Sequence, residues 1–280
     1  MQYNIFYKRL RDGIRAVGTH FRILAMTVLL TSLTACQKVI NMDFKDVTGK
    51  YVIEGNVTDL AGPYTVTISQ VGKVENDYSF TGVSQATVAI SDNAGNNETL
   101  QEVQPGIYQT STLAGVEGRT YNLNITLGNN TFTASSTMPQ RVNLDSLYIK
   151  RVFNFSKTVL AVVPVFTDPP QQGNWYRFNQ YINGVLDKTL YYEDDDFSNG
   201  QVNSWPLLRP SADSTLHVND QVNVEMECID RPMYEYWYSA DQSATGNGAS
   251  IPSNPVTNIQ GGALGYFSAH TSQTKSIIVK

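Results

Sequence analysis

Short runs that alternate apolar and polar residues recur along the chain from residue 50 to its end. Clear examples are residues 51–57, 64–68, 83–90 and 221–229, and clusters of Gly, Pro, Asn and Asp lie between such runs. Successive side chains of a β-strand point to opposite faces, so a period of two indicates a strand with one buried face. The sequence therefore predicts a mainly β fold.

The runs fall into two groups, which predict two domains. The first group ends near Pro139, and its six or seven short strands predict an N-terminal immunoglobulin-like or transthyretin-like β-sandwich over residues 50–139. Residues 140–280 predict a second β-rich domain with one short helix. Within it, the run 159–166 is nearly all apolar, which is typical of a strand buried on both faces.

Two local signals in the second domain are specific. Asn183 and Gly184 lie between two β-rich runs, which predicts a hairpin with a type I′ turn, because both turn positions need a positive φ. Asp230 can cap a helix that has Pro232 in its first turn, and the apolar residues that follow recur at helical spacing. We therefore expect a helix over residues 231–241.

Part of the first domain resembles a known sandwich. Residues 85–90, 106–108 and 121–125, together with Asp92 and Gly95, are similar to the carboxypeptidase-regulatory, transthyretin-like domain. The resemblance implies a fold and no activity, because unrelated functions share such sandwiches.

The N-terminus carries the features of an export signal. Five basic side chains precede an apolar run over residues 23–33, and Leu33-Thr34-Ala35-Cys36 follows. This last stretch resembles the bacterial lipobox, which implies that residues 1–35 are a lipoprotein signal peptide and that Cys36 becomes the lipidated first residue. An uncleaved membrane anchor is the alternative, but the apolar run is about half of the roughly 20 residues needed to span a bilayer.

A lipidated Cys36 determines where we expect the protein to be. Fatty acyl chains such as palmitate would hold it in the outer membrane, and residues 36–49 would form a tether to the first domain. Gln37 and Lys38 follow the cysteine, where an acidic patch would resemble a surface-export signal. The membrane face, periplasmic or surface, therefore stays open.

Charge limits the possible partners. The whole chain has a net charge of −5, and residues 1–35 contain five basic side chains and one acidic side chain, so the remainder carries −9. Such acidity disfavours nucleic acid, whose phosphates need a basic surface. It also disfavours electrostatic docking on anionic lipid. We expect a membrane link through the acyl chains, with no nucleic-acid partner and no cofactor.

Two sets of residues are candidates for binding. The first consists of aromatic side chains that could bind a glycan: Tyr191, Tyr192, Trp205 and Tyr236. The second is the acidic run Asp194, Asp195 and Asp196, whose carboxylates could bind Ca²⁺. The run lacks the alternating spacing and the turn glycine of a dedicated calcium loop, so a solvated hairpin exit is the favoured interpretation.

Signatures of catalysis are missing from the sequence. His217 and His270 are the histidines that follow the signal peptide, and neither has a partner at metal-ligand spacing. No nucleophile elbow, phosphate loop or dinucleotide motif occurs. Cys228 lies on the apolar face of a predicted strand, which favours a buried structural thiol. We expect a protein that is not an enzyme; a hydrolase would need His217 or His270 in a pocket with a carboxylate and a hydroxyl.

The order of motifs along the whole chain resembles one further family. The lipobox, residues 51–57, residues 175–178 and residues 261–267 are similar to a "domain of unknown function" family of Bacteroidota outer-membrane lipoproteins encoded beside TonB-dependent receptors. The resemblance implies a non-enzymatic accessory or binding subunit of a TonB-dependent uptake system, without assigned site residues. A glycan-binding surface lipoprotein is the alternative, followed by a hydrolase.

Overall fold

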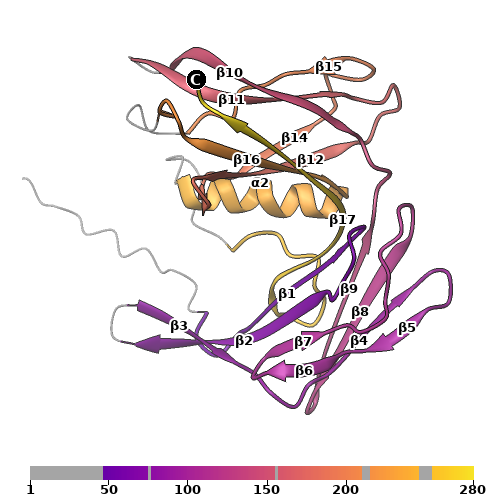
Figure 1. The fold of residues 1–280 in the computed structure, drawn as a ribbon. Coiled ribbons are helices and arrows are strands. Elements are labelled where there is room, and N and C mark those ends of the chain that lie inside the picture. Colours follow the sequence, from indigo (N-terminus) through magenta and orange to yellow (C-terminus); the bar gives the residue numbers. More distant parts are fainter. Residues whose placement is uncertain (1–46, 75–76, 155–156, 210–214, 246–253) are drawn as a thin grey trace, which may run out of the picture. The chain divides into compact units, whose positions relative to one another are not determined.

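The computed structural model describes residues 47–280 apart from 75–76, 155–156, 210–214 and 246–253 (Figure 1). The predicted signal peptide, Cys36 and most of the predicted tether lie outside the described residues. Among the helices that are described, none is long and apolar enough to cross a membrane.

The described part of the chain is mainly β and contains one helix, as the sequence predicts. The elements are β1 (Tyr51–Thr58), β2 (Thr65–Val74), β3 (Asp77–Gly82), β4 (Thr87–Asp92), β5 (Asn97–Thr99), β6 (Gln101–Gln104), β7 (Ile107–Gln109), β8 (Thr120–Leu127), β9 (Asn130–Thr137), β10 (Leu144–Asn154), β11 (Lys157–Thr167), β12 (Trp175–Ile182), β13 (Val185–Leu186), β14 (Tyr191–Asp194), β15 (Val202–Asn203), β16 (Gln221–Ile229), α2 (Arg231–Thr245) and β17 (Leu264–Ile278).

A long sheet runs through both halves of this region. Its strand order is β13-β12-β16-β17-β1-β2-β7-β6, with β14 paired to β12 and β3 paired to β2. The strand that joins the halves is β17. Its first half pairs in parallel with β1, from Val52 against Leu264 onward, and its second half pairs antiparallel with β16. The sheet therefore crosses the predicted domain boundary at residue 139.

Two smaller sheets cover this long sheet and enclose two apolar cores. The sheet β5-β4-β8-β9 packs over the part formed by the N-terminal strands, and side chains such as Ile53, Ile90 and Tyr121 fill the space between them. The sheet β10-β11-β15 forms a second core with β12 and β16, around Phe166 and Tyr176. The apolar run 159–166 lies in β11, between β10 and β15, which confirms its prediction as a central strand.

The predicted hairpin and helix are both present. Asn183 and Gly184 have φ values of 52° and 80°, and Ile182 pairs with Val185 across the turn. The return strand is short, because the Asp187 side chain accepts the Thr189 N–H and hydroxyl and turns the chain out of the ladder before β14. Asp230 caps α2 by accepting the Met233 N–H at 3.1 Å, and the helix continues to Thr245, beyond the predicted end.

The thiol of Cys228 is buried, as its place in the alternation predicts. Its side chain is 2% exposed and its sulfur accepts the Val142 N–H at 3.3 Å. Burial raises the pKa of the thiol above its usual range. A raised pKa keeps the thiol protonated, which fits a structural role.

Candidate functional site

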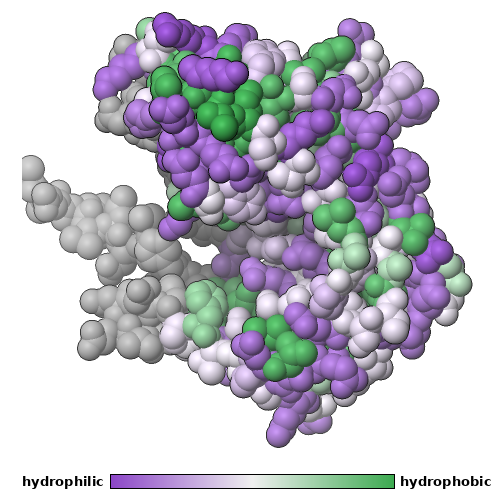
Figure 2. All heavy atoms as spheres, in the orientation of Figure 1, coloured by the Kyte–Doolittle hydropathy of each residue, from purple (hydrophilic) through white to green (hydrophobic). Residues whose placement is uncertain are grey.

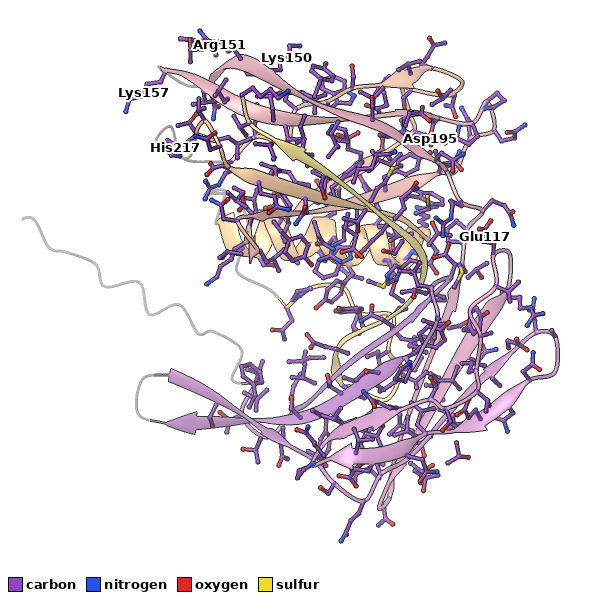
Figure 3. The ribbon with its side chains drawn as sticks, in the orientation of Figure 1. Glu117, Lys150, Arg151, Lys157, Asp195 and His217 are labelled. Carbon is purple, nitrogen blue, oxygen red and sulfur yellow. The ribbon has the colours of Figure 1, made fainter. Side chains whose placement is uncertain are left out.

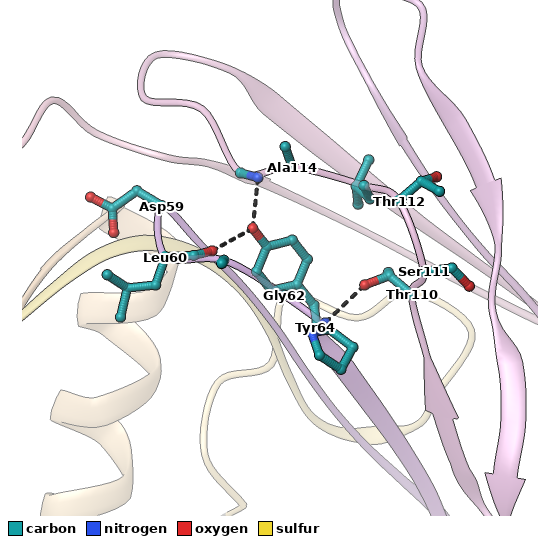
Figure 4. Close-up of a pocket in the computed structure, with 12 residues that line it drawn as sticks. Asp59, Leu60, Gly62, Tyr64, Thr110, Ser111, Thr112 and Ala114 are labelled. Carbon is teal, nitrogen blue, oxygen red and sulfur yellow. Dashed lines mark hydrogen bonds between the residues drawn. The ribbon is translucent and has the colours of Figure 1, made fainter.

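Two surface pockets differ in how far their polar groups are hydrogen-bonded within the chain. The first has a volume of about 570 Å³ and lies between residues 59–64 and 110–115 (Figure 4). Its polar groups are bonded to one another: the Tyr64 hydroxyl donates to the Leu60 carbonyl at 2.7 Å and accepts the Gly115 N–H at 2.8 Å. Asp59, at its rim, pairs with Arg141. These bonds hold the loops together, and we assign this pocket a structural role.

The second pocket, which we call the aromatic pocket, lies where β14, β15 and α2 meet. It has a volume of about 460 Å³. Its lining consists of aromatic, carboxylate, amide and small side chains, namely Tyr192, Glu193, Asp194, Phe197, Ser198, Gln201, Val202, Asn203, Trp205 and Tyr234. None of these lining residues is basic, so the pocket presents apolar rings beside negative charge.

Two rings of the aromatic pocket are open to solvent. The side chain of Phe197 is 99% exposed and that of Trp205 is 63% exposed, and Val202 between them is exposed as well. Apolar residues on the face shown in Figure 2 occur in separate patches among polar ones. Large exposed rings next to a pocket indicate a binding surface, because they cost free energy in water unless a ligand covers them.

Two tyrosines of the lining, Tyr192 and Tyr234, pack against each other, and Tyr238 packs beside them. The ring of Tyr192 lies 5.7 Å from that of Tyr234 and 5.9 Å from that of Tyr238, edge to face in both cases. The Tyr192 hydroxyl donates to Asp241 at 3.0 Å, and the Tyr234 hydroxyl donates to Asp194 at 2.9 Å. Burial and these carboxylate acceptors raise the pKa values of both phenols, so both stay neutral donors.

One carboxylate of the lining, Glu193, has a shifted pKa. Burial raises the pKa of Glu193 to about 7, and the negative charge of Asp194 adds to the effect. The Asn203 amide opposes it by donating to Glu193 Oε2 at 3.2 Å. A carboxyl group with such a pKa can donate or accept a hydrogen bond near neutral pH, and perturbed groups of this kind are common in binding sites.

The structure brings together some of the predicted candidates and separates others. Tyr192, Trp205 and Asp194 line the aromatic pocket. The Tyr191 side chain packs against the second core, and Tyr236 packs against Trp237 and Tyr266. Tyr191 and Tyr236, which the sequence groups with Tyr192 and Trp205 as candidates for glycan binding, are therefore not part of the pocket lining.

The three acidic side chains of residues 194–196 point into three different surroundings. Asp194 accepts the Tyr234 hydroxyl, Asp195 is 3% exposed, and Asp196 is exposed. Among the described residues no three His, Cys, Asp or Glu side chains are grouped so that they could hold a metal ion. The side chains of the three acidic residues are therefore not gathered at one place.

Sequence reasoning missed several residues of the pocket. Phe197, Glu193, Asn203 and Tyr234 line it and are not among the predicted binding residues. The spacing of Tyr234 and Tyr238, four residues apart on α2, places both on one helix face. That face turns towards β14 rather than into the sheet core, and the helical spacing alone does not decide this direction.

A separate polar network lies between α2 and the long sheet. Ser268 Oγ is 2.8 Å from His270 Nδ1, and His270 Nε2 is 3.9 Å from Glu227 Oε1. Arg177 Nη1 donates to Glu227 at 3.0 Å, and its guanidinium lies 3.8 Å from the ring centroid of Trp237. Ser268, His270 and Glu227 are each at most 5% exposed.

The network has the residue types of a hydrolase, and all three side chains are buried in this arrangement. None of the three lines either pocket described above. His217, the other candidate, is exposed, lies beside Asp220 and is far from Asp195 in Figure 3. The arrangement explains how α2 is fixed on the sheet, since Trp237 covers the ion pair of Arg177 and Glu227.

A comparison with models of known protein families finds a match. The model of a family described as a domain of unknown function (DUF4249) matches residues 37–276, which is most of the chain. No curated protein and no solved structure matches the chain.

Proposed function

The chain belongs to the DUF4249 family, and on that premise we propose that it is a non-enzymatic, lipid-anchored binding protein of the outer membrane. In this proposal it serves as an accessory subunit of a TonB-dependent uptake system and holds a ligand in the aromatic pocket. The observation that carries the binding role is the exposure of Phe197 and Trp205 beside carboxylates in a pocket of about 460 Å³.

The membrane location rests on the N-terminal sequence. Cys36 follows a basic segment and a short apolar run in the order that lipoprotein signal peptides have. Acyl chains are the attachment that suits an acidic protein, because a negative surface is repelled by anionic lipid. The Bacteroidota setting and the partnership with a TonB-dependent receptor come from the resemblance described above.

Burial of the serine–histidine pair supports a binding role over a catalytic one. A general base must reach the proton that it removes, directly or through one water molecule. Ser268 and His270 are 3% and 5% exposed and lie under α2, so the chain would have to rearrange before a substrate could touch them.

A glycan is the ligand class that the pocket fits best. Aromatic rings offer a flat apolar face to a sugar ring, and Glu193 and Asp194 can accept hydrogen bonds from its hydroxyls. Trp205 and Phe197 can cover the ligand, while Tyr192 and Tyr234 pack against each other in the lining. This arrangement favours the glycan-binding interpretation as a refinement of the uptake role.

The membrane part of the proposal is tested by replacing the lipidated residue. We expect Cys36→Ser to move the protein from the membrane fraction to the soluble fraction of the cell envelope. Gentle detergent extraction of the wild-type protein should then co-purify a large barrel receptor. Membrane retention of the variant would contradict the anchor, and a lone monomer after extraction would contradict the partnership.

The ligand part is tested by a glycan-binding screen followed by calorimetry. We expect Trp205→Ala to weaken binding by about five- to 150-fold, because a stacked ring contributes about 1–3 kcal/mol. Phe153→Ala is the matched control, since Phe153 is an exposed ring on β10 that does not line the pocket. Equal affinities for the two variants would exclude the aromatic pocket as the binding site.

A further inference from the structure

Buried oxygen atoms without a hydrogen-bond donor are concentrated at one place. In the part of the chain that the structure describes, six buried side-chain polar atoms have no partner. Four of the six are oxygens of Asp168, Ser198, Asn199 and Asn203. Buried polar atoms are almost always bonded, so four exceptions among neighbouring residues require an explanation.

Backbone and side-chain bonds bring these residues to the same end of β11. The loop after β14 folds over the end of β11: the Asp168 N–H donates to the Gln201 carbonyl at 2.9 Å, and Phe166 pairs with Asn203. Inside the loop, the Ser198 N–H and the Asn199 amide both donate to the Asp195 carbonyl, at 3.0 and 2.9 Å. Figure 3 labels Asp195 at this end of the strands.

Two of the side chains at this end of β11 are buried carboxylates. Asp168 is 1% exposed and Asp195 is 3% exposed, and they are close enough to interact electrostatically. The Tyr176 hydroxyl donates to Asp168 Oδ1, and the Asn174 N–H and amide donate to Asp195 Oδ2. No Lys, Arg or His among the described residues pairs with either carboxylate.

We propose that Asp168, Asp195, Asn199 and Asn203, with the Ser198 hydroxyl, form a binding site for a calcium ion. Calcium is bound in proteins by six to eight oxygen atoms, from carboxylates, amide carbonyls, backbone carbonyls and water. Three of the four unpaired oxygens, those of Asp168, Asn199 and Asn203, are of these types, and the carboxylates of Asp168 and Asp195 balance the charge of a divalent ion. The proposal is independent of the glycan and of the uptake role.

Other cations suit the site less well. Zinc in proteins prefers nitrogen and sulfur ligands, and neither is present among these oxygens. Magnesium needs near-ideal octahedral geometry and keeps several water molecules, whereas these side chains are largely shielded from solvent.

The site differs from the acidic run of Asp194, Asp195 and Asp196, which the sequence presents as a calcium candidate. Asp195 is the one member of that run that takes part; Asp194 accepts the Tyr234 hydroxyl and Asp196 is exposed. The other ligands come from the end of β11 and from residues 198–203. This separation supplies a matched control, because charge at Asp196 can be removed without touching the site.

A bound ion would hold one wall of the aromatic pocket in place. Ser198 and Asn203 belong to the proposed site and also line the pocket, and Phe197 and Trp205 lie beside them in the chain. An ion linked to Asp168 would fix this wall to the end of β11. We therefore expect calcium to protect the loop of residues 195–203 from proteolysis.

The direct test is a calcium titration of the detergent-solubilised, chelator-treated protein. We expect calorimetry to give one calcium ion per chain. At a calcium concentration about 100 times the dissociation constant, the melting temperature should rise by roughly 5–10 °C. No binding and no shift at millimolar calcium would overturn the proposal, and an equal response to magnesium alone would overturn the assignment to calcium.

Substitutions locate the ion. We expect Asp168→Asn and Asn199→Ala each to weaken calcium binding at least tenfold, and Asp196→Asn to leave it unchanged. The amide in Asp168→Asn has the shape of the carboxylate and no charge, so the fold should persist, which circular dichroism checks; the half-buried Asn199 provides a second variant. Loss of binding in Asp196→Asn alone would show that the exposed charge binds the ion and would overturn the site.

Terbium luminescence shows whether the bound ion lies close to an aromatic side chain. Terbium replaces calcium and emits when a nearby aromatic ring is excited, and the Tyr176 hydroxyl is bonded to Asp168. We expect tyrosine-sensitised emission that added calcium suppresses and that Asp168→Asn abolishes. Emission that persists in this variant at wild-type strength would place the ion elsewhere.

Discussion

Buried carboxylates have opposite surroundings in the N-terminal and C-terminal halves of the molecule. In the N-terminal half, Asp92 accepts hydrogen bonds from Ala94, Asn96 and Arg119. Burial alone would raise its pKa, but these donors hold the pKa below its usual range. Glu98 is similar, since the backbone N–H groups of residues 111–113 lower its pKa.

In the C-terminal half, Asp168 and Glu193 each accept a hydrogen bond from one side chain, from Tyr176 and Asn203 respectively. Burial raises the pKa of Asp168, the Tyr176 hydroxyl opposes the change, and the charge of Asp195 adds to it. The pKa of Glu193 is raised as well. Carboxylates that are fully bonded within the chain stabilise the fold, whereas incompletely bonded ones indicate a place where something else binds. The comparison supports the proposal that the binding site lies in the second half.

The largest effect is expected where the two halves share a strand. Gly265 in β17 has φ +93°, and a Cβ there would lie 2.0 Å from the Ile53 carbonyl oxygen. We expect Gly265→Ala to lower the free energy of unfolding by roughly 3–5 kcal/mol, because a backbone clash adds to the cost of a positive φ. Urea denaturation followed by tryptophan fluorescence measures the loss.

Gly95→Ala is the control for that experiment. Gly95 has φ +92°, almost the same angle, but a Cβ there meets nothing within 4 Å. Its cost should be about 1 kcal/mol. If the two variants lost the same stability, the close contact between β1 and β17 would not be a constraint on the fold.

The second effect concerns the fully bonded carboxylate. We expect Asp92→Asn to lower the free energy of unfolding by about 3 kcal/mol at pH 7, because it breaks an ion pair with Arg119 and leaves buried donors without their acceptor. Chemical denaturation measures it, with Asp145→Asn at an exposed position as the control. A neutral result would remove the contrast with Asp168.

The third effect is a change with pH in the difference in unfolding free energy between wild type and Asp92→Asn. This change should be smaller than the difference at pH 7. The pKa of Asp92 in the folded state lies below its ordinary value of 3.8, so the stability that Asp92 contributes is fully present above pH 3.8. It is lost as the pH falls through the folded-state pKa. Wild type and Asp92→Asn should therefore converge in stability in strong acid. Denaturation curves between pH 2 and 7 that stay parallel would contradict this assignment.

The smallest expected effect is the loss of stability from placing alanine at an open turn, and it should be equal for Gly95 in the first half and Gly184 in the second. Gly184 has φ +80° and, like Gly95, has open space where a Cβ would be. We expect Gly184→Ala to cost about 1 kcal/mol, since only the backbone conformation is penalised. Thermal unfolding of the two variants measures this. A much larger loss for Gly184→Ala would show that the halves also differ in their turns.

Some of the site could be anticipated and some could not. Trp205, Tyr192 and the acidic residues were visible as residue types that bind ligands, and three of the candidates do line the aromatic pocket. Tyr236 and Tyr234 lie two positions apart on the same helix, so their opposite directions depend on how α2 is rotated against the sheet. That rotation follows from contacts such as Arg177 with Trp237, which span distant parts of the chain.

The sequence by itself determined the β class, the Asn183–Gly184 hairpin, the capped helix and the buried thiol of Cys228. These features depend on alternation and on allowed φ angles, which act between residues close together in the chain. Only the tertiary structure decided that β17 pairs with β1 and that Asp168 meets the loop of residues 195–203. Such contacts close long loops, and their stability comes from packing that no local pattern encodes.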